Sequence, residues 1–129
     1  MIDADRQQLV SHAIAAREQA YAPYSQFLVG AALLAESGPI ITGCNVENAS
    51  FGLTICAERN ALFAAVAQGH RRFQAIAIAT VGGAMPCGAC RQVLAEFSAD
   101  LAVLIVDVDH PDLVTETSLA VLLPGRFQL

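Results

Sequence analysis

Three cysteines and a glutamate form the chemically most specific pattern in the sequence. Cys56-Ala57-Glu58 is followed further along the chain by Pro86-Cys87-Gly88-Ala89-Cys90. Cysteine thiolates are common ligands of Zn²⁺, and three protein ligands leave the fourth tetrahedral position to water, as in catalytic zinc sites. Glu58 follows Cys56 closely enough to exchange a proton with that water without binding the metal itself. The pattern therefore predicts a catalytic zinc site.

Both cysteine groups lie at the starts of predicted helices. Apolar spacing predicts one helix over 56–68 and another over 87–97. The N-terminus of a helix presents unpaired N–H groups and the positive end of the helix dipole, which lower the pKa of a thiol and stabilise the thiolate. Cys87 and Cys90 have i,i+3 spacing, so both can face one metal ion from the same helical turn.

Two other interpretations of the cysteines stay open at this point. A C-x-x-C pair such as Cys87 and Cys90 can be a redox dithiol, although this leaves Cys56 and Glu58 without a role. The fourth cysteine, Cys44, could complete a structural four-cysteine zinc site. Cys44 ends a predicted strand, in a different local context, so a buried inert thiol is the expectation for it.

The remaining elements predict an α/β fold that would position these helix starts. Helical spacing predicts an amphipathic helix over 3–21 and a last short helix over 118–123; apolar runs predict strands over 27–35, 40–44, 73–80 and 101–107. A hairpin followed by helix-linked strands predicts a three-layer α/β/α sandwich with a mixed, mostly parallel central sheet of about five strands. No linker, charge block or repeat divides the sequence, so we expect a single domain over residues 1–129.

The composition argues against several classes of protein. All seven basic residues are arginine, which excludes Schiff-base and P-loop chemistry that depends on lysine. A net charge of −5 without an extended basic cluster argues against a nucleic-acid partner. No apolar run approaches the ~20 residues of a membrane-spanning helix, so no membrane association is expected.

Location and assembly can also be predicted from composition. The segment Met1–Arg6 lacks the features of a signal peptide, so we expect a cytoplasmic protein with reduced cysteines. Hydrophobic residues make up 55% of the chain and charged residues only 15%. Such a chain would expose an apolar surface, which predicts association with further copies of itself.

Five motifs, spread over nearly the whole chain, strongly resemble the small, homotetrameric cytidine deaminases. They are the segments 22–33, 43–50, 56–59, 86–92 and 122–127. The cysteines and Glu58 match the three-cysteine form of the zinc nucleobase deaminase pattern. The resemblance implies hydrolytic deamination of cytidine and 2′-deoxycytidine in pyrimidine salvage, with one Zn²⁺ per subunit. Zinc-bound hydroxide would attack C4 of the base while Glu58 shuttles protons.

The resemblance also implies how the nucleoside would be bound. Asn45 and Glu47 match a pair that holds the ribose, Phe27 matches an aromatic side chain that packs on the nucleoside, and Ala57 would offer backbone groups to the base. Plain structural roles remain alternatives: turn capping for Asn45 and strand packing for Phe27. The ribose pair favours a nucleoside over blasticidin S, the substrate of a deaminase in the same superfamily.

Two phenylalanines would reach a neighbouring subunit. Phe51 stands where many relatives carry tyrosine, in a segment that enters a neighbour's site, and the missing hydroxyl puts a hydrogen bond there in doubt. Phe127 matches a C-terminal aromatic residue that closes over the base, although this chain ends earlier than many relatives. A homotetramer with shared active sites is therefore expected.

Polar side chains beside the ligands would adjust the charge of the metal site. Three thiolates on Zn²⁺ sum to −1, which weakens the metal as a Lewis acid. Arg59 and Arg91 adjoin the ligand-bearing segments, and the resemblance implies that they hydrogen-bond the thiolates and withdraw charge, with Gln92 beside them. A structural zinc module would instead need a fourth protein ligand.

Overall fold

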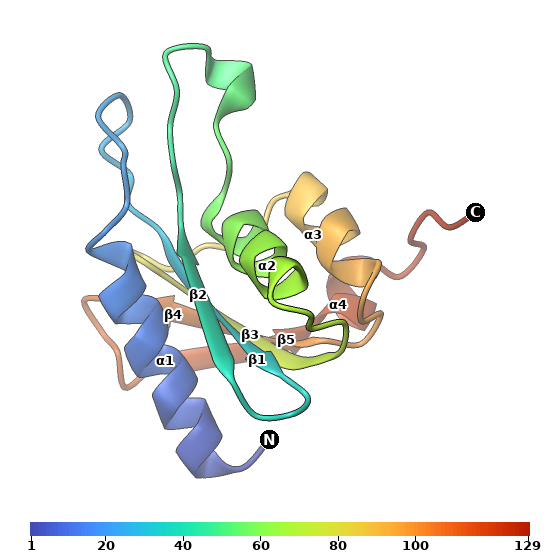
Figure 1. The fold of residues 1–129 in the computed structure, drawn as a ribbon. Coiled ribbons are helices and arrows are strands. Elements are labelled where there is room, and N and C mark those ends of the chain that lie inside the picture. Colours follow the sequence, from blue (N-terminus) through green and yellow to red (C-terminus); the bar gives the residue numbers. More distant parts are fainter.

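The computed structural model describes residues 1–129 and has a five-stranded sheet at its centre (Figure 1). Its elements are helix α1 (Asp3–Arg17), strands β1 (Gly30–Ala35) and β2 (Ile40–Cys44), the 3₁₀ helix η1 (Phe51–Leu53), helix α2 (Ala57–Ala67), strand β3 (Phe73–Thr80), helix α3 (Gly88–Ala95), strands β4 (Ala102–Asp107) and β5 (Val114–Ser118), and helix α4 (Leu119–Leu122). No helix is both long and apolar enough to span a bilayer.

The strand order is β2-β1-β3-β4-β5, and only the β3–β4 pair is parallel. The pairs β1–β2, β1–β3 and β4–β5 are antiparallel. The prediction of a mixed sheet of about five strands is confirmed, but the prediction of a mostly parallel sheet is wrong. The helical crossover from β2 through α2 places β3 beside β1 rather than beside β2, and a second hairpin adds β5 to the far edge. Only the crossover through α3 joins adjacent strands.

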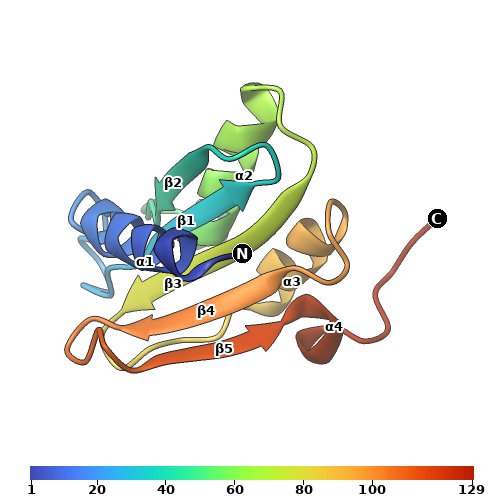
Figure 2. The same cartoon turned by 90° about the horizontal axis from the view of Figure 1, so that it is seen from below.

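The sheet carries α1 on one face and α2, α3 and α4 on the other, which confirms the three-layer prediction (Figure 2). On the first face, Leu9 and Ala13 of α1 pack on alternate residues of the sheet. On the second face, Leu62 of α2, Leu94 of α3 and Leu119 of α4 pack in the larger core. The central strands are buried on both faces, which explains their continuous apolar runs.

Helix α2 approaches strand β2 very closely at Gly43. A Cβ at this position would collide with the backbone nitrogen of Ala61 and the carbonyl oxygen of Ala57. Glycine is therefore required here, and the contact fixes the first turn of α2 against the end of β2. That turn carries the predicted zinc ligand Cys56 at its start.

All four helices and strands β1 and β4 are shorter than predicted, and α1 and β1 lose the most residues at one end. Helix α1 ends at Arg17, because the N–H groups of Glu18 and Gln19 bond the carbonyls of Ala15 and Ala16 in a closing 3₁₀ turn. Strand β1 begins at Gly30 rather than residue 27. Of the backbone groups of residues 27–29, the Val29 carbonyl still accepts from the backbone N–H of Asn45, whereas side chains bond the N–H of Val29 and the carbonyls of Phe27 and Leu28.

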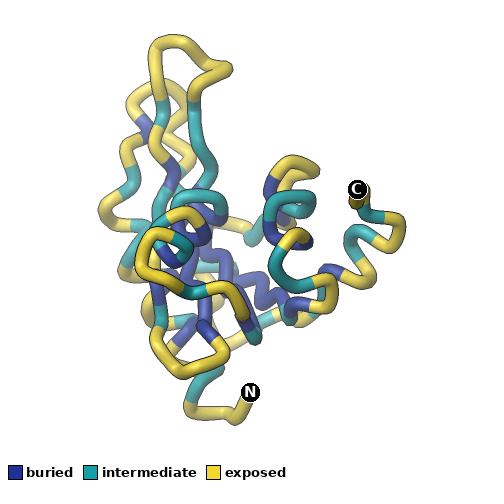
Figure 3. The backbone as a smooth tube through the Cα atoms, turned by 45° about the vertical axis from the view of Figure 1, so that its right-hand side comes forward, coloured by how far each residue is buried: buried dark blue, intermediate teal, exposed yellow.

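Residues 46–55 form an arm that projects from the sheet, with η1 at its tip (Figure 1). Paired backbone hydrogen bonds between Val46 and Ile55 close its base. Figure 3 shows that its tip is exposed. Phe51 and Leu53 at this tip are 72% and 66% exposed, so two apolar side chains face solvent within one chain.

Candidate active site

The sulfur atoms of Cys56, Cys87 and Cys90 form one cluster, with all three within 4.8 Å of one another. The Sγ of Cys87 lies 4.0 Å from that of Cys56 and 3.4 Å from that of Cys90. In a tetrahedral zinc site with Zn–S bonds of ~2.3 Å, two sulfurs lie roughly 3.8 Å apart. The donor set and its spacing therefore fit a zinc ion. Cys44 lies outside the cluster, and burial raises the pKa of its thiol.

Two helix starts bring these sulfurs together. Cys56 is the N-cap residue of α2, and Cys87 is the N-cap residue of α3. Cys90 lies in the first turn of α3 and is fully buried. The positive ends of two helix dipoles thus point at one cluster of thiols, as the sequence predicts.

The surroundings of the cluster favour ionisation of Cys56 over that of Cys90. The hydrogen bond with Cys90 and the guanidinium of Arg59 hold the pKa of Cys56 at about 5. The pKa of Cys90 is raised, first by its hydrogen bond with the Cys56 thiolate and then by burial. Adjacent thiolates repel each other, so a cation among them is needed before all three ionise together.

Arg59 contacts the cluster directly. Its Nη2 donates to the Sγ of Cys56 over 3.2 Å, and the thiolate raises the pKa of the guanidinium further. Its Nε is buried without a hydrogen-bond partner. A charged group held this way, between sulfur and protein interior, is suited to offset the negative charge of a thiolate site.

Arg91 behaves differently from Arg59. Its Nε donates to the carbonyl of Pro86 over 2.7 Å and its Nη1 to the carbonyl of Leu122 over 3.0 Å. The expectation that Arg91 hydrogen-bonds a sulfur is therefore wrong. Its guanidinium instead joins the backbone of Pro86, directly before Cys87, to the backbone of Leu122 in the C-terminal segment. Gln92 donates to the carbonyl of Phe127 and ties the C-terminal tail to α3.

Glu58 lies beside the cluster in the first turn of α2. It is only 5% exposed, and burial is the main cause that raises the pKa of its carboxyl group. A carboxyl group in these surroundings holds a proton more readily than one in water. This is the property that a proton-carrying group needs near neutral pH.

A cavity of about 200 Å³ opens next to Glu58 and the sulfurs. Its walls come from the segment before β1, the residue after β2, the arm, the start of α2, strand β3 and the loop before α3. The lining residues are Phe27, Val29, Asn45, Thr54, Cys56, Ala57, Glu58, Ile78, Ala84, Met85 and Cys87. The structure thus brings Phe27, Asn45 and Ala57 to the same cavity as the zinc ligands. Ala84 and Met85 line the cavity without having been predicted as site residues; their position directly before Pro86-Cys87 is the sequence signal that points to them.

Asn45 and Glu47 have structural partners in this chain. The side-chain amide of Asn45 accepts from the N–H of Val29 over 2.9 Å and donates to the carbonyl of Phe27 over 2.8 Å. Glu47 does not line the cavity. Its carboxylate accepts from the N–H groups of Tyr24 and Ser25 and from the Ser25 hydroxyl, and the hydroxyl lowers the pKa of the carboxylate most.

Phe51 and Phe127 lie outside the cavity of their own chain. Phe51 packs edge-to-face on Tyr24 with ring centroids 5.8 Å apart, yet it remains largely exposed. Phe127 is 69% exposed on the C-terminal tail. Within one chain, neither ring covers the predicted site.

Three cysteines at two helix starts meet a buried glutamate beside the sheet of an α/β fold. This combination is typical of the zinc-dependent deaminases. A family model described as the cytidine and deoxycytidylate deaminase zinc-binding region matches residues 3–106. The chain belongs to this family. Its zinc-binding character and the three-sulfur cluster confirm the predicted cofactor.

Individual relatives match over nearly their whole length. The cytidine deaminase of Sporosarcina psychrophila is 50% identical over 126 residues, which cover 95% of this chain and 91% of that protein. The cytidine deaminase of Halalkalibacterium halodurans is 52% identical, with 95% and 94% covered. A crystal structure of cytidine deaminase from Burkholderia pseudomallei superimposes with a TM-score of 0.88 at 50% identity, covering 94% of this chain and 98% of that one.

Proposed function

We propose that this protein is a zinc-dependent hydrolase that converts cytidine and 2′-deoxycytidine to uridine and 2′-deoxyuridine. One water is consumed and one ammonia is released: a C–O bond forms at C4 of the base and the C4–N bond breaks. The observation that carries the proposal is the placement of a buried Glu58 beside the three-sulfur cluster at one cavity, in a chain half identical to cytidine deaminases. The pyrimidine salvage role expected from the sequence rests on the same reaction.

Cys56, Cys87 and Cys90 would hold the zinc ion, which supplies a Lewis acid that lowers the pKa of a bound water. Glu58 would accept a proton from the attacking water on its carboxylate and deliver it to N3 of the pyrimidine. It then carries a second proton to the departing amino nitrogen. The burial that raises the pKa of Glu58 suits a group that must both accept and donate a proton.

The nucleoside would lie in the cavity with its ribose toward Asn45 and Glu47. The Asn45 amide has two N–H donors and uses one on the carbonyl of Phe27, which leaves the other for a ribose hydroxyl. Glu47 accepts three hydrogen bonds from Tyr24 and Ser25, and a carboxylate can accept about four. Phe27 is half-exposed at the cavity, where its ring can pack on the nucleoside, and Ala57 would offer backbone groups to the base.

The test is a zinc assay combined with an ultraviolet assay of purified protein on cytidine and 2′-deoxycytidine. We expect one zinc per chain, conversion to the uracil nucleosides, and one ammonia per nucleoside converted. Blasticidin S and adenosine serve as comparison substrates and should react far more slowly. Zinc-loaded protein that leaves both cytosine nucleosides unchanged would contradict the proposal.

We propose further that the active unit is a homotetramer with shared sites. The cavity of about 200 Å³ in one chain is smaller than the ~300–1,000 Å³ typical of ligand pockets, and the exposed Phe51 and Phe127 are available to complete a neighbour's walls. An elution mass near four times 13.6 kDa is expected, with activity falling as dilution dissociates the assembly. A fully active monomer in light scattering at the assay concentration would contradict shared sites.

Residues 1–129 would act as one catalytic domain in each subunit, working in the cytoplasm. The four cysteines are free thiols, and a site built from three of them needs a compartment that keeps thiols reduced. Fluorescence of a tagged chain in its host cell tests the location. Limited proteolysis tests the domain, because a single domain should resist cleavage between the zinc-binding helices.

A further inference from the structure

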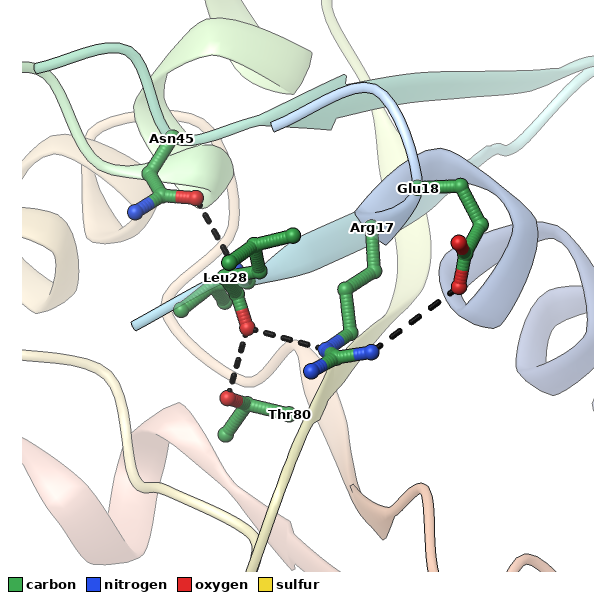
Figure 4. Close-up of polar contacts among 6 residues, drawn as sticks. Arg17, Glu18, Leu28, Asn45 and Thr80 are labelled. Atoms are coloured by element: carbon green, nitrogen blue, oxygen red, sulfur yellow. Dashed lines mark hydrogen bonds and ion pairs between the residues drawn. The ribbon is translucent and has the colours of Figure 1, made fainter. Parts of the chain in front are cut away.

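The wall of the cavity that carries Phe27 is not part of the sheet. Strand β1 begins at Gly30. The Val29 carbonyl still accepts from the backbone N–H of Asn45, and side chains from three other parts of the chain bond other backbone groups of residues 27–29 (Figure 4). Asn45 holds the N–H of Val29 and the carbonyl of Phe27. The carbonyl of Leu28, between them, receives two donors: the Thr80 hydroxyl and the Arg17 guanidinium.

Thr80 makes the shorter of these two hydrogen bonds. Its Oγ1 donates to the Leu28 oxygen over 2.7 Å, and the residue is only 1% exposed at the end of β3. A buried hydroxyl without a partner is costly, so this bond strongly fixes both groups. The backbone carbonyl of Thr80 also accepts from the N–H of Gly83 over 3.3 Å. Thr80 therefore connects the Phe27 wall with the loop that leads to Cys87, which lines the same cavity.

Arg17 reaches Leu28 because the end of α1 rests directly on the start of β1. A Cβ at Gly30 would collide with the carbonyl of Ala13 and the backbone nitrogen of Arg17. This close approach brings the Arg17 Nε to 3.1 Å from the Leu28 oxygen. The remaining ion pair of Arg17, with the exposed Glu18, is loose at 3.8 Å. The main interaction of the Arg17 guanidinium is therefore its hydrogen bond to the backbone carbonyl of Leu28.

The backbone directly before this wall is strained. Gln26 has a φ of 58°, in the left-handed region that a side chain with a Cβ adopts only at a cost. Such a conformation persists only where the surroundings hold it. The side-chain hydrogen bonds to residues 27–29 are the contacts that hold the chain immediately after Gln26.

We propose that Thr80 and Arg17 are positioning residues that fix Phe27 against the bound nucleoside through the carbonyl of Leu28. This inference rests on the proposed function, because it takes the cavity as the nucleoside site. Neither residue lines the cavity, and their side chains bond Leu28 and Glu18 rather than the sulfurs or Glu58. Loss of either donor would therefore weaken nucleoside binding and leave the proton transfers intact.

The test compares Thr80→Val, which removes the hydroxyl and keeps the shape, with Thr80→Ser, which keeps the hydroxyl. Thr80→Val should raise KM for cytidine roughly 3- to 10-fold, as for loss of one buried hydrogen bond, while kcat and zinc content stay within about twofold of wild type. Thr80→Ser should restore KM. Arg17→Met should also raise KM, and the double variant should exceed the product of the two effects because it alone leaves the shared acceptor without either donor.

Two controls separate positioning from general stability. Thr117→Val makes the same chemical change on β5, away from the cavity, and should leave KM unchanged. Val103→Ala creates a small core defect on β4 and provides a variant with lowered Tm. If Val103→Ala raises KM as much as Thr80→Val does, or if Thr80→Val keeps the wild-type KM, the proposal is overturned.

Hydrogen exchange supplies a readout that does not need turnover. In Thr80→Val, amides in the peptide spanning residues 24–30 should exchange faster than in wild type, and Thr80→Ser should not show this change. Unchanged exchange would overturn the positioning role even if the enzyme is active. Faster exchange in a protein that does not convert cytidine would instead contradict the proposed function and leave the role of Thr80 in holding the wall intact.

Discussion

Cys56 and Cys87 occupy the same position, the N-cap, on two different helices, and their sulfurs lie 4.0 Å apart. Neither side chain caps its own helix by a hydrogen bond. Both sulfurs are therefore free to face a ligand between the two helix starts, where the helix dipoles favour negative charge. The arrangement stabilises thiolates before any metal binds. Two ligands that are far apart in sequence meet because the fold brings the starts of α2 and α3 together.

Removal of one cluster sulfur should abolish stable zinc binding. Cys87→Ser is expected to lose most of its zinc, because two thiolates are a much weaker site than three. Cys44→Ser is the matched control, since Cys44 lies outside the cluster, and it should keep both zinc and activity. Metal analysis after dialysis measures both. Loss of zinc from Cys44→Ser would show that the ligand set is different.

Glu58→Gln should keep zinc and fold but lose turnover. The amide fills the same buried space and forms hydrogen bonds, yet it cannot carry a proton. General acid–base catalysis contributes about 10²–10⁴ in rate, so kcat should fall by that factor. Steady-state kinetics, zinc analysis and a thermal melt check the three parts. A variant that retains a tenth of the wild-type kcat would contradict the assignment of Glu58.

The local elements of this fold could be predicted from sequence more completely than their arrangement. Strands β2 and β3 have the predicted bounds, because apolar runs and flanking turn residues define them locally. The start of β1 was predicted three residues early. Residues 27–29 are as apolar as a strand, but side chains of Asn45, Thr80 and Arg17 bond backbone groups that a neighbouring strand would otherwise pair. Strand direction likewise depends on which strands become neighbours.

The candidate site, like the fold, could be predicted only in part from the sequence. The sulfur cluster and Glu58 could be predicted because each residue type is chemically distinctive and their spacing matches a known pattern. Arg17 and Thr80 could not, since an arginine near a helix end and a threonine in a strand are common, and their shared partner is a backbone carbonyl. The partners of Arg91 also depend on where the C-terminal segment packs.

Loss of the Arg59 guanidinium should weaken zinc binding. Its hydrogen bond to the Cys56 sulfur stabilises the thiolate, and residues that support metal ligands in this way typically contribute 10- to 100-fold in metal affinity. Arg59→Met keeps most of the side-chain volume and removes the charge. Competition with a chelator measures the affinity. Arg71→Met is the control, because the Arg71 guanidinium bonds only the backbone carbonyls of Val66 and His70. It should bind zinc as wild type does.

Asp107 should make a pH-dependent contribution to stability. Its carboxylate accepts hydrogen bonds from His110 and from the N–H groups of Asp109 and Gly82, and these lower its pKa in the folded chain. A carboxylate with a lowered folded pKa stabilises the protein above its unfolded pKa of ~3.9, and this contribution is lost as pH falls through the folded pKa. Asp107→Asn should therefore be less stable than wild type at neutral pH.

The difference between the two proteins should shrink as the pH is lowered from about 5 through the folded pKa of Asp107. Urea unfolding of both proteins across this range measures it, and the comparison cancels effects that they share, such as loss of zinc. Asp112→Asn is the control, because Asp112 is an exposed acid in the same turn region. A constant difference between Asp107→Asn and wild type at every pH would show that the carboxylate charge is not responsible.

Shared active sites can be tested by combining two inactive chains. Phe127 is exposed and lies outside the cavity of its own chain, so in a shared site it would cover the cavity of a neighbour. Glu58→Gln and Phe127→Ala chains, each with a different tag, are expressed together, and assemblies that carry both tags are purified. A Phe127→Ala chain has an intact Glu58 and can receive an intact Phe127 from a Glu58→Gln neighbour.

Mixed assemblies should therefore be more active than assemblies of either variant alone. If Phe127 acted only within its own chain, no chain in the mixture would carry both intact residues, and activity would not return. The control is a mixture of Glu58→Gln with Phe127→Ala/Glu58→Gln, in which every chain lacks the proton carrier and activity should stay absent. A Phe127→Ala protein with wild-type kcat/KM would show that the ring does not cover any site. In that case the exposed C-terminal aromatic residue would serve association alone, and the cavity would be completed by other residues.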